Sequence, residues 1–218
     1  MCGRFGLQVS QAVLRSHLAA WLAHEDESWL AHYAPRSLIC PGEPVLVLRR
    51  DHGRDQMAHK LWGLLPCWVR DPNRRQRLIN ARSETLAQKP SFRGPWRHRR
   101  CLLPCSGYLE KRNLIHRENG DLFWLAGLWD RWLGADGSEV ETCCVITTSA
   151  NSLISPLHDR MPVVIPGGLE DCWLEPGDHA HRRNLEAMLS PGDPDGWSCT
   201  SSSDPPIPEG VDQQLFML

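Results

Sequence analysis

Two dipeptides, Asn119-Gly120 and Asp136-Gly137, constrain the fold more than any other feature of this sequence. Each is typical of a two-residue hairpin turn, because both turn positions need a positive φ that Asn, Asp and Gly tolerate. They bracket an apolar segment at 122–129, and a second apolar segment follows at 140–148. The sequence therefore predicts neighbouring antiparallel strands in the middle of the chain.

The flanking segments predict further strands and helices. Ser10 can cap a helix at 10–24, where apolar residues recur at helical spacing. Strands are predicted at 45–49 and 57–63, joined by a turn at 51–53, and further strands at 101–104 and 161–166. Shorter helices are predicted at 81–89, 168–174 and 180–189. Loops are predicted at 34–44, 71–77 and 190–208. These elements indicate an α+β fold in a single domain, with residues 1–190 as its body and 191–218 as a loop or tail.

The cysteine pattern and the apolar content exclude several protein classes. Nine cysteines occur without a CxxC pair, so a zinc site has little support, and we expect no metal and no cofactor. In a reducing compartment most of these cysteines should be buried thiols. The sequence has no run of ~20 apolar residues and no signal-peptide pattern. We therefore expect a cytoplasmic protein without a membrane partner.

Positive charge is concentrated in the middle of the chain. Residues 70–112 contain twelve Lys and Arg against three acids, whereas residues from 167 onward contain ten acids against two arginines. Arginine dominates, and its planar guanidinium binds phosphates in pairs and stacks on bases. A basic face for nucleic acid explains this distribution, and an ordinary solvated surface explains it about as well.

The chain begins Met1-Cys2-Gly3-Arg4-Phe5. If Met1 is removed, Cys2 carries a free α-amine and a thiol on adjacent carbons. Such an aminothiol condenses with an aldehyde to an imine, and the sulfur then closes a thiazolidine ring. The α-amine has a pKa near ~8, so part of it is neutral and nucleophilic at pH 7. A cysteine at position 2 by chance is the simpler alternative for this residue taken alone.

Three other segments contain candidate site residues. Asn80 offers an amide that can orient a substrate, although it could equally cap a helix. Glu110 follows a Gly-Tyr turn and could act as an acid or base, or form a simple salt bridge. His158 could transfer protons near neutral pH, or be structural. Arg82 and Arg160, beside these residues, could hold phosphates.

In order and spacing these segments resemble the SOS response-associated peptidase family, whose members process abasic sites. The matching motifs are Met1 to Phe5, Trp62 to Trp68, Asn80 to Thr85, Lys89 to Phe92, Arg100 to Pro104 and His158 to Pro162. They extend over about residues 1–175. The resemblance implies one domain around a barrel-like arrangement of antiparallel strands, with a basic groove on one face.

The resemblance also implies roles for individual residues. Cys2 would be the nucleophile, forming a thiazolidine crosslink with abasic sites in single-stranded DNA after Met1 is lost, often by autoproteolysis. Asn80 would position the sugar and the amine, Glu110 would act as the acid, and His158 would assist proton transfer. The implied DNA contacts are Arg4, Pro41, Trp68, Arg82 and Arg160. Two positions depart from the family pattern: Lys111 replaces a tryptophan, and Cys40 an alanine.

Three hypotheses of function follow. The first is a covalent sensor of abasic sites in the DNA damage response. This protein would be a peptidase with lyase activity. It would act as a monomer and be associated with the nucleoid when it is bound to DNA. The second is a thiol peptidase or amidohydrolase acting on an outside peptide through Cys2, His158 and Glu110. The third is a non-enzymatic single-strand binding module that uses arginines and tryptophans only. The arginine-rich middle favours DNA over a peptide, and a cysteine at position 2 favours amine chemistry.

Overall fold

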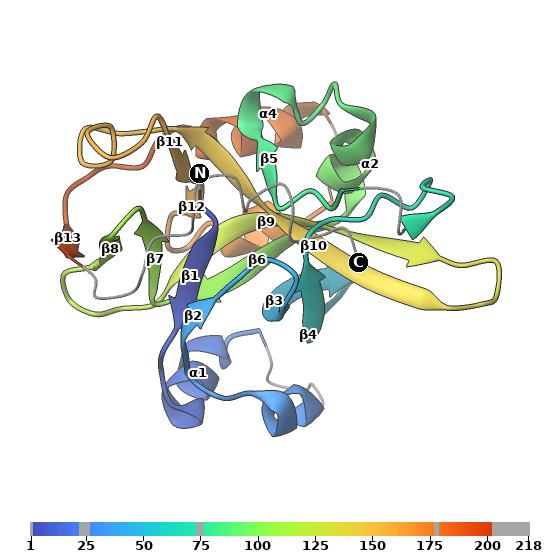
Figure 1. Cartoon of the computed structure of the whole chain (residues 1–218), viewed down its shortest axis with the longest axis horizontal. Coiled ribbons are helices and arrows are strands. Elements are labelled where there is room, and N and C mark those ends of the chain that lie inside the picture. Colours follow the sequence, from blue (N-terminus) through green and yellow to red (C-terminus); the bar gives the residue numbers. More distant parts are fainter. Residues whose placement is uncertain (1, 22–26, 73–75, 177–178, 202–218) are drawn as a thin grey trace.

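Five strands close into a barrel at the centre of the computed structural model (Figure 1). The order of neighbours is β10-β4-β3-β6-β9, and β9 pairs with β10 again. Every pairing is antiparallel except that of β10 with β4, which is parallel. The structure describes residues 2–21, 27–72, 76–176 and 179–201. The barrel strands are β3 (Pro44–Asp51), β4 (Arg54–Trp62), β6 (Arg100–Cys105), β9 (Phe123–Leu133) and β10 (Glu139–Ser149).

Three short strands extend the barrel at its edges. They are β5 (Asn80–Arg82), β11 (Arg160–Pro162) and β12 (Val164–Ile165). Strand β5 runs parallel to β10 and β11 antiparallel to it, while β12 pairs with β9. Thr147 of β10 therefore pairs with Arg82 on one side and with Pro162 on the other. This end of β10 gathers segments that are far apart in the sequence.

A second, antiparallel sheet packs beside the barrel in the order β13-β8-β7-β1-β2. Its strands are β1 (Arg4–Leu7), β2 (Arg36–Ile39), β7 (Gly107–Glu110), β8 (Asn113–Arg117) and β13 (Trp197–Ser201). Strand β1 is an interior strand of this sheet, because it pairs with both β7 and β2. The start of the chain is therefore held by a sheet on two sides.

The helices are short and cover the outside of the sheets. They are α1 (Gln11–Leu18), α2 (Pro90–His98), α3 (Glu170–Leu174) and α4 (His179–Met188), with 3-10 turns η1 (Glu27–His32) and η3 (Ser83–Thr85). The Ser10 side chain caps α1, and proline occupies the first turn of α2, where its missing N–H costs nothing. No helix within the described ranges is long and apolar enough to cross a membrane.

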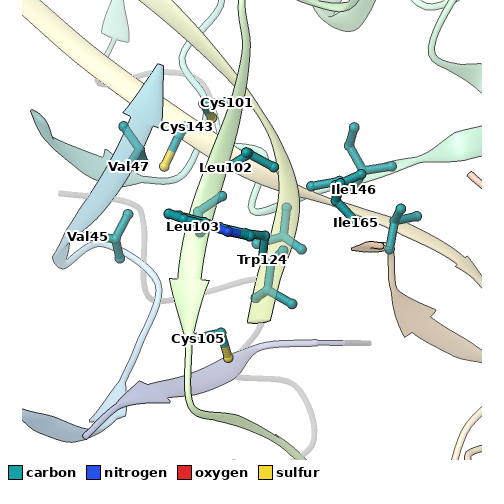
Figure 2. Packing of buried hydrophobic residues seen from close by; sticks show 14 of the residues in the cluster. Val45, Val47, Cys101, Leu102, Leu103, Cys105, Trp124, Cys143, Ile146 and Ile165 are labelled. Atoms are coloured by element: carbon teal, nitrogen blue, oxygen red, sulfur yellow. The ribbon is translucent and has the colours of Figure 1, made fainter. Parts of the chain in front are cut away.

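The barrel is filled by side chains from all of its strands. Figure 2 shows Val45 and Val47 of β3 close to Leu103 of β6, with Cys143 of β10 nearby. Gly127 of β9 is required by this closure, because a Cβ there would lie 3.1 Å from the carbonyl oxygen of Cys144 and closer still to the Leu103 side chain. Close packing of this kind leaves no room for a larger residue.

The structure confirms the α+β class and the barrel, with parallel pairings of β10 that the sequence did not predict. All three predicted turns have glycine at positive φ, namely Gly53, Gly120 and Gly137. Five of the nine cysteines are buried, and all nine are free thiols, as expected. The boundary between a 1–190 body and a tail stays a prediction.

Four predicted elements were wrong in detail. The loop at 34–44 contains β2, and the loop at 190–208 contains β13, because pairing with β1 and β8 gives these polar segments a partner. The helix at 81–89 is instead β5 followed by η3. Helix α1 ends at Leu18, short of the predicted His24. Residues 22–24, 73–75 and 202–208 of the predicted elements lie outside the described residues.

Candidate functional site around Cys2

Cys2 lies two residues before the start of β1, and its side chain is completely buried (0% exposed). Its Sγ atom lies 4.0 Å from the carbonyl oxygen of Arg4. Arg4 pairs with Leu109 of β7, and Cys2 lies close enough to Glu110, the last residue of that strand, for the carboxylate charge to act on the thiol. Burial, and then the negative charge of Glu110, raise the pKa of the Cys2 thiol to about 12. The thiol is therefore protonated at neutral pH.

Asn80 contacts Cys2 directly. Its Nδ2 donates a hydrogen bond of 3.0 Å to the carbonyl oxygen of Cys2. Asn80 is the first residue of strand β5, where its backbone lies opposite Val145 of β10. The N-cap position of the following 3-10 turn, η3, is occupied by Arg82 and not by Asn80. The alternative of Asn80 as a helix cap is therefore wrong. The other amide atom, Oδ1, is buried and accepts no hydrogen bond from any residue that the structure describes.

Glu110 is buried (6% exposed) at the end of β7, opposite Asn113 of β8. Tyr108 lies two residues earlier and therefore on the same face of the strand. Burial is the main cause that holds the pKa of Tyr108 well above its usual value, and burial likewise raises the pKa of Cys105. Neither Tyr108 nor Cys105 was among the predicted site residues, although strand alternation before Glu110 could have pointed to Tyr108.

His158 lies in the loop that leads into β11. Its Nδ1 atom is 2.9 Å from the backbone nitrogen of Arg160 and 2.7 Å from Oδ1 of Asp159. These contacts are alternatives: a neutral Nδ1 accepts the Arg160 N–H, whereas a protonated Nδ1 donates to the exposed Asp159 carboxylate. Strand β11 pairs with the same end of β10 as β5, the strand that contains Asn80 and Arg82. The fold thus brings His158 to the same end of the barrel as Asn80.

Comparison with known proteins identifies the family of this chain. The family model for the SOS response-associated peptidase (SRAP) matches residues 1–204. The chain belongs to the SRAP family. It is 32% identical over 206 residues to the abasic site processing protein YoqW of Bacillus subtilis, covering 89% of each chain. It is 30% identical over 189 residues to the abasic site processing protein YedK of Escherichia coli, covering 80% of this chain and 79% of that protein.

A solved structure shares the fold of this SRAP chain. A crystal structure of a protein from Bacteroides thetaiotaomicron matches it with a TM-score of 0.76 and 27% sequence identity. The alignment covers 90% of this chain and 91% of the other. The barrel and its accompanying sheet are therefore the SRAP fold.

Two of the predicted phosphate-binding arginines of this SRAP chain contact other parts of the protein. Arg4 is buried, and its Nη2 donates to the carbonyl oxygen of Lys111 at 2.9 Å. Lys111 has a φ of 55°, so the turn after β7 aims this carbonyl at Arg4. Arg160 forms a bidentate ion pair with Glu84 and also donates to the carbonyl oxygen of Thr147. The contact with Glu84 joins the loop of His158 to the segment that carries Arg82.

The other predicted DNA contacts are accessible. Arg82 is exposed on β5, Trp68 is 49% exposed, and Pro41 is partly exposed. Phosphate-binding and base-stacking roles for these residues stay predictions. Within the described part of the chain, no group of three or more His, Cys, Asp or Glu could hold a metal ion.

Proposed function

We propose that this SRAP protein captures abasic sites in single-stranded DNA as a covalent crosslink through Cys2, after removal of Met1. The hydrogen bond from Asn80 to the Cys2 carbonyl, with buried Glu110 beside the thiol, is the observation that supports this most. These contacts hold the first residue of the processed chain next to an acid and an amide. The names of the related proteins YoqW and YedK support abasic sites as the substrate.

The proposed reaction has two bond-forming steps. The α-amine of Cys2 attacks the aldehyde carbon of the ring-opened sugar, and loss of water gives an imine. The Cys2 sulfur then adds to the imine carbon, and the thiol proton passes to the nitrogen, which closes the thiazolidine. Glu110 donates the proton that the departing water needs, and His158 assists proton transfer when the crosslink reverses. No oxidant or reductant is required.

Removal of Met1 also prepares the thiol for this reaction. In the unprocessed chain the Cys2 thiol has a pKa of about 12 and is a poor nucleophile at pH 7. A new α-ammonium group on the same residue favours the thiolate through its positive charge. The unsatisfied Oδ1 of Asn80 is a suitable acceptor for an N–H of this new amine.

We infer that the same site hydrolyses the Met1–Cys2 bond, which would make Met1 removal autoproteolytic. A lyase activity is a further part of the proposal, because an imine at the sugar carbon acidifies the neighbouring protons and lets the 3′ phosphate leave by elimination. We also propose that the protein acts as a monomer in the cytoplasm and joins the nucleoid when it binds DNA.

Intact mass spectrometry tests the proposed function directly. The purified protein should have the mass of the chain without Met1. Incubation with a single-stranded oligonucleotide containing an abasic site should add the mass of the oligonucleotide less one water. The same oligonucleotide with an intact base should add nothing. Retention of Met1, or failure to form this adduct, would contradict the proposal, and hydrolysis of added peptides would then favour the thiol peptidase hypothesis.

Replacement of Glu110 by glutamine should slow adduct formation by about a hundredfold, because a positioned acid contributes about two to four orders of magnitude. The amide keeps the size of the side chain but cannot deliver a proton. The rate is measured by stopping the reaction with abasic DNA at timed points and separating the adduct on a denaturing gel. Exposed Glu118 offers a matched control, since Glu118→Gln should react like the wild type. An unchanged rate in Glu110→Gln would remove the acid role.

Replacement of Glu84 by glutamine should tighten binding of single-stranded DNA about two- to fivefold. Glu84 pairs with the Arg160 guanidinium in the free protein. The Arg160 side chain is only 11% exposed, but the Glu84 side chain is 52% exposed, so solvent screens the carboxylate and we expect the pair to contribute about 1 kcal/mol. A phosphate can therefore displace it, and the displacement costs less without the carboxylate. Fluorescence anisotropy with an undamaged labelled oligonucleotide measures the change. Glu139→Gln, whose partner is Arg131, provides the control. Weaker binding by Glu84→Gln would mean that the pair with Arg160 is needed for structure.

A further inference from the structure

A hollow with a volume of about 410 Å³ lies beside the turn that joins β8 to β9. The end of β8, the start of β9, helix α1 and the segment before α3 all contribute residues to its lining. A second hollow of about 450 Å³ adjoins it along α1, because His17, Asp121 and Leu122 line both. Volumes of this size are typical of sites for small molecules. The two hollows together give space for an elongated ligand.

The first hollow is separate from the site of Cys2. Strand β8 connects the two regions: its first residue, Asn113, pairs with Glu110, and its last residue, Arg117, lines the hollow. Four residue steps along a strand measure about 13 Å, at about 3.3 Å per step. None of the residues assigned to the proposed reaction is among the described residues that line the hollow. A ligand bound there would therefore lie outside the reaction centre.

Three carboxylates line the first hollow, those of Glu118, Asp121 and Glu170. None of them forms an ion pair with any residue that the structure describes. Arg117 also lines the hollow, but its guanidinium lies over the ring of Trp197, 4.1 Å from the ring centroid. The lining therefore has an excess of negative charge, and we call this space the acidic hollow.

His17 does not offset the negative charge of the acidic hollow. Its ring lies against that of Trp124, with the two ring centroids 5.3 Å apart. Burial lowers the pKa of His17, although the charges of Glu170 and Asp121 act in the opposite direction. An imidazole with a pKa below its ordinary value of about 6.5 is neutral at pH 7. His17 thus presents no positive charge that would repel a cationic ligand.

Glu170 points independently to a cationic ligand. It is only 8% exposed, yet it lines the acidic hollow. Its Oε2 accepts the backbone N–H of Gly168 at 2.7 Å, whereas Oε1 has no hydrogen-bond partner in the part of the chain that the structure describes. A buried carboxylate is unfavourable unless a cation or further donors compensate its charge. The described residues leave Glu170 without the cation that buried Asp130 has in Arg99.

The arrangement suits an organic cation better than a metal ion. No three His, Cys, Asp or Glu side chains within the described ranges are grouped closely enough to hold a metal. Apolar surface from half-buried Leu122 accompanies the carboxylates, and the adjoining hollow continues it with Val9 and exposed Val13. A ligand with ammonium groups separated by methylene chains matches both features, because it places charge beside carboxylates and buries hydrocarbon between them.

We propose that the acidic hollow binds a linear aliphatic polyamine. Its ammonium groups donate hydrogen bonds to the carboxylates of Glu118, Asp121 and Glu170, and its methylene chain packs on Leu122. A polyamine fits better than a side chain of a protein partner, because a single lysine or arginine would neutralise only one of the three carboxylates. This site goes beyond the proposed function, since neither DNA nor a residue of the reaction takes part in it.

Titration calorimetry of the DNA-free protein with spermidine tests the acidic hollow. The Glu118→Gln/Asp121→Asn variant should bind spermidine about tenfold more weakly, because it removes two of the three charge pairs. Glu186→Gln/Asp193→Asn is the matched control, since it removes two exposed acids outside the hollow. This control should keep the wild-type affinity. An equal loss in both variants would overturn the proposal, because overall charge would then attract the amine. Equal unfolding temperatures without spermidine would show that both variants are folded.

A comparison of amines on the wild-type protein tests the same site without any variant. Spermidine carries three ammonium groups, whereas butylamine and a lysine with blocked backbone groups carry one each. Both should bind at least about tenfold more weakly than spermidine. If the blocked lysine binds as tightly as spermidine, the hollow is a site for a protein side chain and the polyamine proposal is wrong. Absence of binding at millimolar spermidine would contradict it as well, whatever the outcome with abasic DNA.

Discussion

Replacement of Cys2 by serine should abolish the heat-stable adduct with abasic DNA, a loss on the order of a thousandfold or more. The processed serine variant retains an α-amine, so it can still form an imine. A hydroxyl adds far less readily than a thiol to that imine, and the imine hydrolyses when the sample is heated. The adduct is measured on a denaturing gel after heating and by intact mass, with sodium borohydride used separately to trap the imine.

Cys67→Ser provides the control for this experiment. Cys67 is an exposed thiol, and it would be the more reactive one if accessibility alone decided the reaction. The control variant should form adducts at the wild-type rate. A normal yield of heat-stable adduct from Cys2→Ser, together with loss of the adduct in Cys67→Ser, would show that Cys67, in the loop before Trp68, is the nucleophile instead of Cys2. Borohydride trapping in Cys2→Ser alone would instead confirm that the amine reacts and that the sulfur completes the ring.

Local sequence signals predicted the barrel strands well because their causes are local. The turn at 51–53 needs two successive residues at positive φ, and His52 and Gly53 supply them. In the turns before β9 and between β9 and β10 only the glycines, Gly120 and Gly137, have a positive φ, and Asn119 and Asp136 do not. Alternating or continuous apolar residues between these turns are sufficient to place β3, β4, β9 and β10 within a few residues.

Elements that depend on distant partners could not be predicted in this way. Strand β2 lies in a segment rich in proline and glycine, and it is a strand only because β1 offers it hydrogen bonds. Asn80 to Arg82 has the composition of a helix start, yet parallel pairing with β10 makes it a strand. Such pairings join residues about thirty or more positions apart, so no short window of sequence contains them.

The candidate site was only partly predictable for the same reason. The order of the motifs pointed to Cys2, Asn80, Glu110 and His158, and the structure brings Asn80 and Glu110 to Cys2. It also shows contacts that no motif indicated, such as Glu84 with Arg160. A surface arginine looks the same in sequence whether it binds a phosphate or a carboxylate. Its partner depends on where two separate loops meet.

Arg100 is the residue on which the outer layer of this fold most depends. It is buried at the start of β6, and its guanidinium donates to four backbone carbonyls. Nη1 donates to Trp96 and Arg97 in the last turn of α2, while Nε and Nη2 donate to Trp173 and Glu175 at the end of α3. The last carbonyls of a helix have no partner within the helix. One side chain therefore satisfies the ends of two helices and ties both to the barrel.

Replacement of Arg100 by leucine should destabilise the protein by about 3–5 kcal/mol, because it leaves several buried carbonyls without donors. For a chain of this size the unfolding temperature should fall by about 10 °C. Burial lowers the pKa of Arg100 to about 10, so the guanidinium is still charged at pH 7 and all of its donors are present there. Calorimetry or circular dichroism measures the change. Arg54→Leu, at an exposed arginine, should change the temperature by a degree or two at most. An equally small change in Arg100→Leu would mean that water replaces the guanidinium and that α2 and α3 dock without it.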